Sequence, residues 1–142
     1  MIRIDTNVLV ALAALQHPDH ARAVAAFEGE LAKGEQFVLS GGIAAELLHV
    51  ITDPRRFVTS HTMSEAVAWL KAWEARVSPK WIVPSEISIR LWLQWIEQFE
   101  LGRKRLLDTQ YAAMLHTFGV QRLLTNNRND FEVFQVFEFI SY

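Results

Sequence analysis

The chain opens with Met1-Ile2-Arg3-Ile4-Asp5-Thr6-Asn7, a short apolar run that ends in an acid and two further polar residues. An apolar helical pattern begins at once with Val8, so this stretch predicts a buried strand that leads directly into a helix. Ligands of open α/β sheets bind just outside the carboxyl ends of the strands, which makes Asp5 a candidate site residue. An equally good interpretation is that Asp5 or Thr6 only caps the helix.

The composition indicates one folded domain, residues 1–142. Half of the 142 residues are apolar, and five Trp and nine Phe can fill a core. The net charge of -2 excludes a strongly basic nucleic-acid clamp, and the lack of Cys excludes disulfides and thiolate metal sites. The first residues resemble no signal peptide, and no apolar run approaches the ~20 residues that span a bilayer. We therefore expect a cytoplasmic protein without membrane contact.

Strand-like runs alternate with helical patterns along the whole chain. Helices are predicted over residues 8–15, 20–33, 43–51, 62–76, 85–98 and 106–118, and strand-like runs over residues 36–39, 81–84, 121–124 and 134–140. The run at 81–84 is either a short strand or an extended link. This alternation predicts an α/β sandwich around a mainly parallel sheet.

Glu46 interrupts the apolar face of the predicted helix 43–51. Ile43, Leu47 and Val50 make that face, and Glu46 lies within it. A carboxylate on a buried face is costly unless a cation or hydrogen bonds meet it. Either Glu46 reaches solvent at the rim, or it is a ligand that points into an acidic pocket.

Further acids are expected at the same end of the sheet as Asp5. Asp108 lies in the first turn of a helix whose apolar side should include Leu107, and Asn127 and Asp130 lie in a polar loop after a late strand. Carboxylates gathered without enough basic partners repel one another, and a divalent cation relieves that repulsion. The candidate ligands are oxygen atoms, and the chain has neither Cys nor a convincing set of His ligands. These ligands favour Mg²⁺ or Mn²⁺ over zinc. With basic residues close by, such a site suggests phosphodiester hydrolysis.

Three other patterns have structural interpretations. His17 and His20 suit a loop or helix-cap role, because no third metal ligand is near. Trp69 and Trp73 are four residues apart and should pack from one helix face. Apolar residues surround nearly the whole helix 85–98, which predicts burial on more than one side, in the core or at a subunit interface.

Four segments follow one another along the chain: Asp5-Thr6-Asn7, Glu46-Leu47-Leu48, Leu107-Asp108-Thr109-Gln110-Tyr111-Ala112-Ala113 and Thr125-x-Asn127-x-x-Asp130-Phe131. Together they resemble a PIN domain of the VapC toxin type, and the match covers essentially the whole chain. His17-Pro18-x-His20 and Thr52-x-Pro54-Arg55-Arg56-Phe57 are also similar to a VapC-like subgroup. The resemblance implies a PIN-like α/β/α sandwich with four to five mainly parallel strands. It also implies a Mg²⁺- or Mn²⁺-dependent ribonuclease, and a homodimer that a small antitoxin inhibits.

The resemblance also assigns roles to single residues. Asp5, Glu46 and Asp108 match the three metal-binding acids, and Thr125 matches the hydroxyl residue of the last motif. Many members of the family have a fourth acid where this chain has Asn127. Asp130, in the same loop, is then the substitute for that acid. One tightly held ion, with others recruited by RNA, fits this departure better than two resident ions.

Two basic clusters are candidates for holding the RNA backbone as positioning contacts. They are Arg103, Lys104 and Arg105 before the Asp108 helix, and Arg55 and Arg56 after the Glu46 helix. For any one of these residues, a solvated basic rim is an equally good interpretation.

Two other functions compete with a nuclease. The first is a receiver-like module that binds a cation without hydrolysis, but it needs an acceptor Asp after the third strand and a Lys near the last strand, and neither is evident. The second is a catalytically weak domain kept for binding a protein partner. Asn127 favours that alternative, and the intact Asp5, Glu46 and Asp108 count against it.

Overall fold

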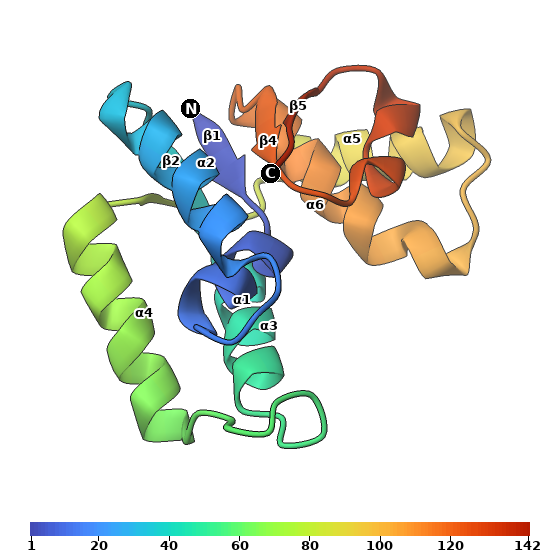
Figure 1. The fold of residues 1–142 in the computed structure, drawn as a ribbon. Helices are drawn as coiled ribbons and strands as arrows, with labels where there is room; N and C mark the ends of the chain where they lie inside the picture. The colour runs from blue at the N-terminus through green and yellow to red at the C-terminus, as the bar shows by residue number, and fades with distance from the viewer.

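The computed structural model describes all 142 residues and is built around one five-stranded sheet. The strands are β1 (Ile2–Ile4), β2 (Phe37–Ser40), β3 (Lys80–Ile82), β4 (Arg122–Leu124) and β5 (Glu138–Ile140). Their order is β3-β2-β1-β4-β5, and every pair is parallel. The opening strand β1 is therefore the central strand, and its three residues are all buried (Figure 1).

Helices cover both faces of this sheet. The α-helices are α1 (Thr6–Ala13), α2 (His20–Ala32), α3 (Gly41–Ile51), α4 (Met63–Val77), α5 (Glu86–Gln98) and α6 (Leu106–Thr117). Short 3₁₀ turns are η1 (Arg103–Arg105), η2 (Arg128–Asp130) and η3 (Glu132–Phe134). One buried apolar cluster joins the sheet to α1, α2, α3 and α4, and a second joins it to α5 and α6. The predicted α/β/α sandwich is confirmed, with a sheet that is wholly parallel.

Local capping explains why two helices begin where the sequence predicts. The Thr62 hydroxyl accepts from the Glu65 amide at 3.2 Å, and the Glu65 carboxylate accepts from the Thr62 amide at 2.7 Å. Ser85 caps α5 in the same reciprocal way with Ser88. Such pairs satisfy amides that have no partner within the first helical turn.

Several predicted elements have different bounds in the structure, among them the last strand and α3. The last strand covers only Glu138–Ile140 rather than residues 134–140, because η3 occupies Glu132–Phe134 and Gln135 has a left-handed φ of 54°. The chain also passes from β2 into α3 without a turn, since Ser40 ends the strand and caps the helix through the Ile43 amide at 3.3 Å.

One expectation about burial is wrong, and a second holds only in part. Leu107 does not lie on the buried side of α6, because its side chain is 76% exposed. The helix α5 is not surrounded by the core: it packs on α6, while Ile87 is 71% and Leu93 55% exposed. Burial of α5 at a subunit interface stays a prediction.

The two histidines have the structural roles expected from the sequence. His17 Nδ1 accepts from the Asp19 amide at 3.1 Å, and His20 Nδ1 lies 2.8 Å from the Ala11 carbonyl oxygen. Both contacts order the connection between α1 and α2. No helix has the length and apolar character required to span a membrane.

Candidate functional site

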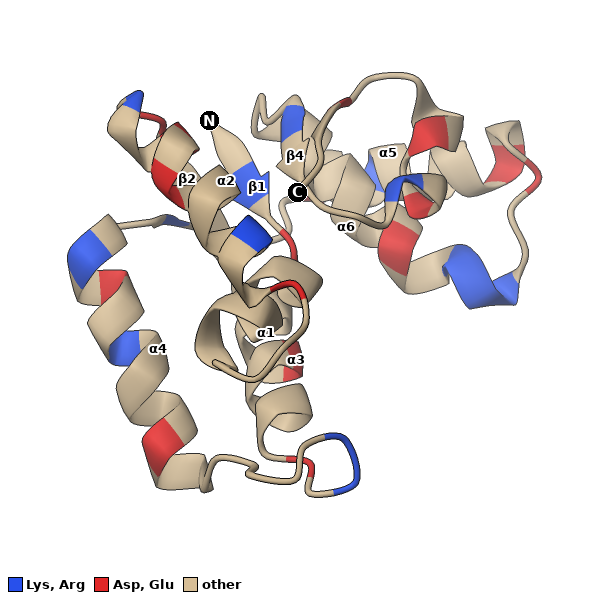
Figure 2. Cartoon of the chain, in the orientation of Figure 1, with Lys and Arg blue, Asp and Glu red and all other residues tan.

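The candidate residues gather at the carboxyl edge of the three middle strands. Asp5 follows β1, Ser40 ends β2 and Thr125 follows β4, and these strands are neighbours in the parallel sheet. The order of the strands reverses between β1 and β4, which is where open α/β sheets bind ligands. Glu46 is the single acid of α3 and Asp108 the single acid of α6, and a red segment marks each of these helices (Figure 2).

Asp5 acts as a helix cap and as a partner for two further groups. Its Oδ1 accepts from the Thr6 amide at 2.9 Å and from Arg3 Nη2 at 2.7 Å. Its Oδ2 accepts from the Thr125 hydroxyl at 2.5 Å. The capping interpretation is confirmed, and since each carboxylate oxygen can accept more than one bond, it leaves room for a ligand role.

Arg3 is a site residue that the sequence analysis did not single out. It is only 3% exposed, and its guanidinium carbon lies 4.6 Å from the centre of the Tyr111 ring and 4.4 Å from that of the Phe131 ring. Its Nε and Nη1 have no hydrogen-bond partner. A buried cation thus compensates the charge of Asp5, and a charged residue inside an otherwise apolar three-residue strand was the available signal.

Glu46 lies at the exposed rim of α3 rather than within its buried face. The buried face consists of Ile43, Ala44, Leu47 and Ile51. Glu46 instead accepts a hydrogen bond from the Thr6 hydroxyl at 2.6 Å. Because Thr6 follows Asp5 directly, this bond ties the Glu46 carboxylate to the same edge of the sheet.

Unlike Asp5, Glu46 and Asp130, the Asp108 carboxylate accepts no hydrogen bond. Burial raises the pKa of its carboxyl group, and the negative charges of Asp130 and Glu46 raise it further. Arg105 and Arg3 act in the opposite direction, with Arg105 Nε 3.9 Å from Asp108 Oδ2. The acids of α3 and of the last loop are therefore each close enough to Asp108 to disfavour its charge.

Thr125 and Asn127 organise the loop after β4. Thr125 is fully buried, and its hydroxyl oxygen accepts from the Asn127 amide at 2.9 Å and from Asn7 Nδ2 at 3.5 Å. The Asn127 side-chain amide donates to Asp130 Oδ2. Asn127 therefore holds the neighbouring acid in place, and Asn7 is a second residue that joins the site without having been predicted.

The donor set suits a hard divalent cation, although the side chains do not yet converge on one point. No three Asp, Glu or His side chains lie close enough together to hold an ion as they are placed. Asp5, Glu46 and Asp130 each accept hydrogen bonds from neighbouring hydroxyl or amide groups instead. Carboxylate and hydroxyl oxygens are the ligands that Mg²⁺ and Mn²⁺ prefer, so the chemistry fits and binding requires side-chain rotation.

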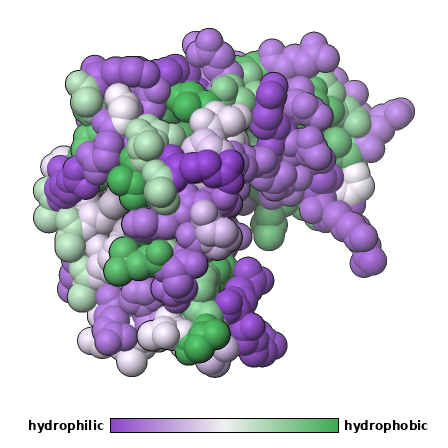
Figure 3. Space-filling view, in the orientation of Figure 1, coloured by the Kyte–Doolittle hydropathy of each residue, from purple (hydrophilic) through white to green (hydrophobic).

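The basic candidates divide into free and engaged side chains. Arg55 and Arg56 pair with Asp53 at 3.1 and 3.8 Å, and Arg105 donates to the Asp130 carbonyl oxygen. Arg103 and Lys104 are exposed and form no ion pair. The outline is hollowed between the part of the molecule that carries α3 and its following loop and the part that carries α6 and η1 (Figure 3). Blue segments lie on both sides of this hollow (Figure 2).

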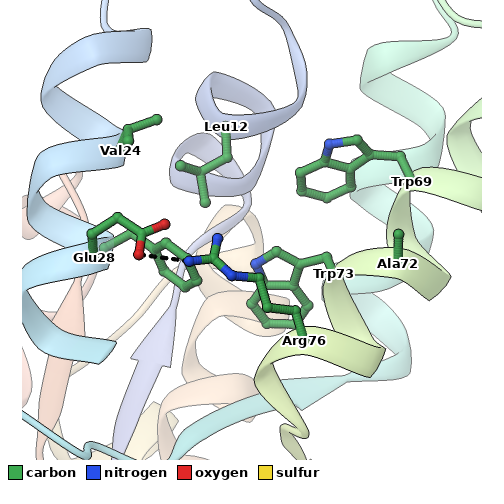
Figure 4. A pocket seen from close by; sticks show the side chains of 8 residues that line it. Leu12, Val24, Glu28, Trp69, Ala72, Trp73 and Arg76 are labelled. Atoms are coloured by element: carbon green, nitrogen blue, oxygen red, sulfur yellow. Dashed lines mark hydrogen bonds and ion pairs between the residues drawn. The ribbon is translucent and has the colours of Figure 1, made fainter. Parts of the chain in front are cut away.

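A second hollow, of about 370 Å³, lies between α1, α2 and α4 and contains none of the candidate acids. Trp69 and Trp73 share one face of α4, as predicted, and face Leu12 and Val24 across this groove (Figure 4). An ion pair of 2.6 Å between Arg76 and Glu28 crosses it. We refer to this hollow as the α1/α2/α4 groove.

A parallel sheet with acids at the reversal of strand order defines a class of α/β proteins that bind ligands at that edge. The PIN domain model matches residues 2–135, and the chain belongs to the PIN domain family. Among the curated proteins, none matches the chain significantly.

Several solved structures share this fold. VapBC-1 from nontypeable Haemophilus influenzae has a TM-score of 0.69 and 16% identity, covering 99% of this chain and 98% of that one. VapBC2 from Rickettsia felis, bound to a promoter DNA fragment, has a TM-score of 0.67 and 17% identity, covering 100% and 99%. VapC20 of Mycobacterium tuberculosis, a toxin that cleaves the sarcin-ricin loop, has a TM-score of 0.59 and 17% identity, and the match covers 92% of each chain. This similarity establishes the shared fold.

Proposed function

We propose that this chain is a Mg²⁺- or Mn²⁺-dependent endoribonuclease of the VapC toxin type that acts in the cytoplasm. The observation that carries the proposal is the crowding of Asp108, Asp130 and Glu46 beside Asp5 at the reversal of strand order. Membership of the PIN domain family and the similarity to the sarcin-ricin loop cleaving toxin support it.

Asp5, Glu46 and Asp108 would hold the cation. When bound, the cation supplies a water of lowered pKa and neutralises charge on the scissile phosphate. Thr125 keeps the Asp5 carboxylate oriented through its 2.5 Å bond, and Asn127 keeps Asp130 at the edge of the site. Asp108, with a raised pKa, gains most from a nearby positive charge.

The hollow beside these acids receives the RNA backbone in this proposal. Arg103 and Lys104 are free to contact phosphates, whereas Arg55 and Arg56 must first release Asp53. Arg105 has a different role, because it holds the loop through the Asp130 carbonyl oxygen. Phosphate contacts of this kind position the strand without reading its sequence.

The decisive experiment compares the wild-type protein with Asp108→Asn. This substitution keeps the size of a half-exposed side chain whose charge is poorly compensated, so the fold and its melting temperature should persist. We expect Mn²⁺-dependent cleavage of RNA to fall at least 100-fold, and Mn²⁺ affinity measured by calorimetry to fall with it. Full cleavage by Asp108→Asn would refute the proposal.

The catalytically weak binding domain remains the second candidate. It is favoured by the hydrogen bonds that engage the acids and by the lack of three convergent ligands. The same calorimetry distinguishes the two functions. Tight Mn²⁺ binding by the wild-type protein without cleavage of any RNA would favour the binding domain.

We also propose that a small antitoxin binds the α1/α2/α4 groove with an apolar segment. The solved relatives include VapBC and FitAB complexes, and the groove presents Leu12, Trp69 and Trp73 to such a segment (Figure 4). The two charged residues that cross it, Glu28 and Arg76, can fix the direction of the segment.

A homodimer through α5 completes the proposal. Ile87 and Leu93 remain exposed on a helix that packs mainly on α6, and covering them removes apolar surface from water. Sedimentation of Leu93→Glu tests this interface, since a buried charge should convert the dimer to a monomer.

A further inference from the structure

A small cavity lies on the β3 side of the sheet, next to the start of α3. It measures about 270 Å³ and is bounded by the ends of β2 and β3, the start of α3 and one face of α6. The residues that line it are Ser40, Gly41, Gly42, Ile82, Val83, Pro84, Gln110, Tyr111 and Met114. We refer to it as the α3/α6 cavity.

The lining of the α3/α6 cavity has a simple chemical pattern. Its walls include Ile82, Pro84 and Met114, and none of its residues carries a charge. Two polar side chains in it are without hydrogen bonds in the protein: the Gln110 amide, and the Tyr111 hydroxyl, whose oxygen is buried. An apolar slot with a few unengaged polar groups suits a flat ligand that has a hydrogen-bonding edge.

The cavity shares two helices with the acidic site. Tyr111 lies one helical turn after Asp108 on α6, and its ring also contacts the Arg3 guanidinium that holds Asp5. Ser40 is only 5% exposed and is fixed as the cap of α3, the helix that carries Glu46. A group in the α3/α6 cavity is therefore bounded by the two helices that carry Asp108 and Glu46.

We propose that the α3/α6 cavity binds one unpaired nucleobase of the RNA next to the cleaved bond, with the Gln110 amide contacting the edge of the base. This inference rests on the proposed nuclease function. A base fits the uncharged lining, whereas a phosphate would require a cation that the cavity lacks. Proteins commonly recognise single-stranded RNA by inserting unstacked bases into such pockets. The site therefore selects the sequence that is cut, while Arg103 and Lys104 hold the backbone.

Two substitutions test the cavity without touching the acids. Gln110→Leu removes the amide at nearly constant size. Gly41→Leu adds a bulky side chain at the wall of the cavity: a Cβ at Gly41 meets no atom within 4 Å, and the backbone there does not require glycine. Gly29→Leu is the matched control, because Gly29 is an exposed position of α2 away from the cavity, and a Cβ there also meets no atom within 4 Å.

The assay is Mn²⁺-dependent cleavage of an oligoribonucleotide library with random sequence, read by sequencing the cut ends. We expect the wild-type protein and Gly29→Leu to prefer one base at a fixed position beside the cut, by roughly tenfold. Gln110→Leu should lose this preference at that position alone, and Gly41→Leu should lose it and cleave more slowly. Circular dichroism and melting temperatures should match the wild type.

The outcomes separate the cavity from the nuclease function. Cleavage by the wild-type protein, with unchanged base preference in Gln110→Leu and Gly41→Leu, overturns the cavity proposal alone. A uniform loss of rate in Gln110→Leu with the base preference retained also overturns it. Failure of the wild-type protein to cleave any RNA in the library overturns the nuclease function and the cavity proposal together.

Discussion

Replacing Arg3 by Met should destabilise the fold more than most single substitutions do. The Arg3–Asp5 ion pair is 2.7 Å long, and its side chains are only 4% and 12% exposed. Removing one member of a buried pair leaves the other charge without compensation, which costs about 3–5 kcal/mol. Asp5 keeps its bonds from the Thr6 amide and Thr125, so we expect the lower end, about 3 kcal/mol. This corresponds to about two orders of magnitude in the folding constant.

Urea unfolding followed by tryptophan fluorescence measures this loss, since the chain has five Trp. The control is Arg90→Met on α5, because the Arg90–Glu86 pair is 77% exposed on both sides. An exposed pair contributes about 0.5 kcal/mol. If Arg3→Met unfolds at the same urea concentration as Arg90→Met, with equal slopes, then the buried pair does not stabilise the site as argued.

The double variant Arg3→Met with Asp5→Asn extends the test. Asp5→Asn alone leaves the Arg3 cation buried among Tyr111 and Phe131 without its carboxylate. The variant should therefore fold with reduced stability while losing metal-dependent cleavage. Removing both charges should restore part of the stability but none of the cleavage, which separates the structural role of Asp5 from its proposed catalytic one.

Three further predictions concern other parts of the molecule. A hydrogen bond from Lys33 lowers the pKa of Glu30, so its stabilisation is present above the ordinary value of 4.5 and lost as pH falls through the folded value. Glu30→Gln should be less stable than the wild type at pH 7 by about 1–3 kcal/mol, a deficit that shrinks in urea titrations below pH 4.5. Thr125→Val should lower Mn²⁺ affinity and cleavage, because Asp5 loses its 2.5 Å donor. Ala72→Arg should block the α1/α2/α4 groove to an antitoxin in a binding assay with the product of an adjoining gene, while RNA cleavage is retained.

Each of these predictions has a result that contradicts it. A stability deficit in Glu30→Gln that is constant between pH 7 and pH 3 would exclude the lowered pKa as its cause. Thr117→Val is the control for Thr125→Val, since Thr117 only contacts the Met114 carbonyl oxygen at the far end of α6. Equal Mn²⁺ affinity in the two variants would remove Thr125 from the site. Full antitoxin binding by Ala72→Arg would place the antitoxin elsewhere.

The order of elements was predictable because local signals determine it. The capping box of Thr62 and Glu65 and the cap at Ser85 both form as their spacing indicates. The buried first strand and the expectation of acids at one end of the sheet follow from the residue pattern, whereas the central position of β1 was not predicted. The family resemblance came from the segments that contain Asp5, Glu46, Asp108 and Asn127, and the PIN domain match confirms it.

The features of the site that could not be predicted depend on contacts between residues far apart in the sequence. Arg3 is held by Tyr111 and Phe131, which are more than a hundred residues away. Helical periodicity placed Glu46 within an apolar face, but the observed face is rotated toward Ala44, so Glu46 reaches Thr6. The predicted burial of Leu107 is wrong for a similar reason, because the buried face of α6 includes Ala112 and Ala113 instead.

The bond between Thr125 and Asp5 joins residues 120 positions apart, and β4 must pair with β1 before it can form. A ribosome adds roughly 5–20 residues per second, so on the order of 10 s separates the synthesis of the two side chains. During that interval Asp5 has no hydrogen bond from the Thr125 hydroxyl, and β1 is not yet paired with β4. In the proposed nuclease, the centre around Asp5 is therefore not assembled while the codons between these two residues are being translated.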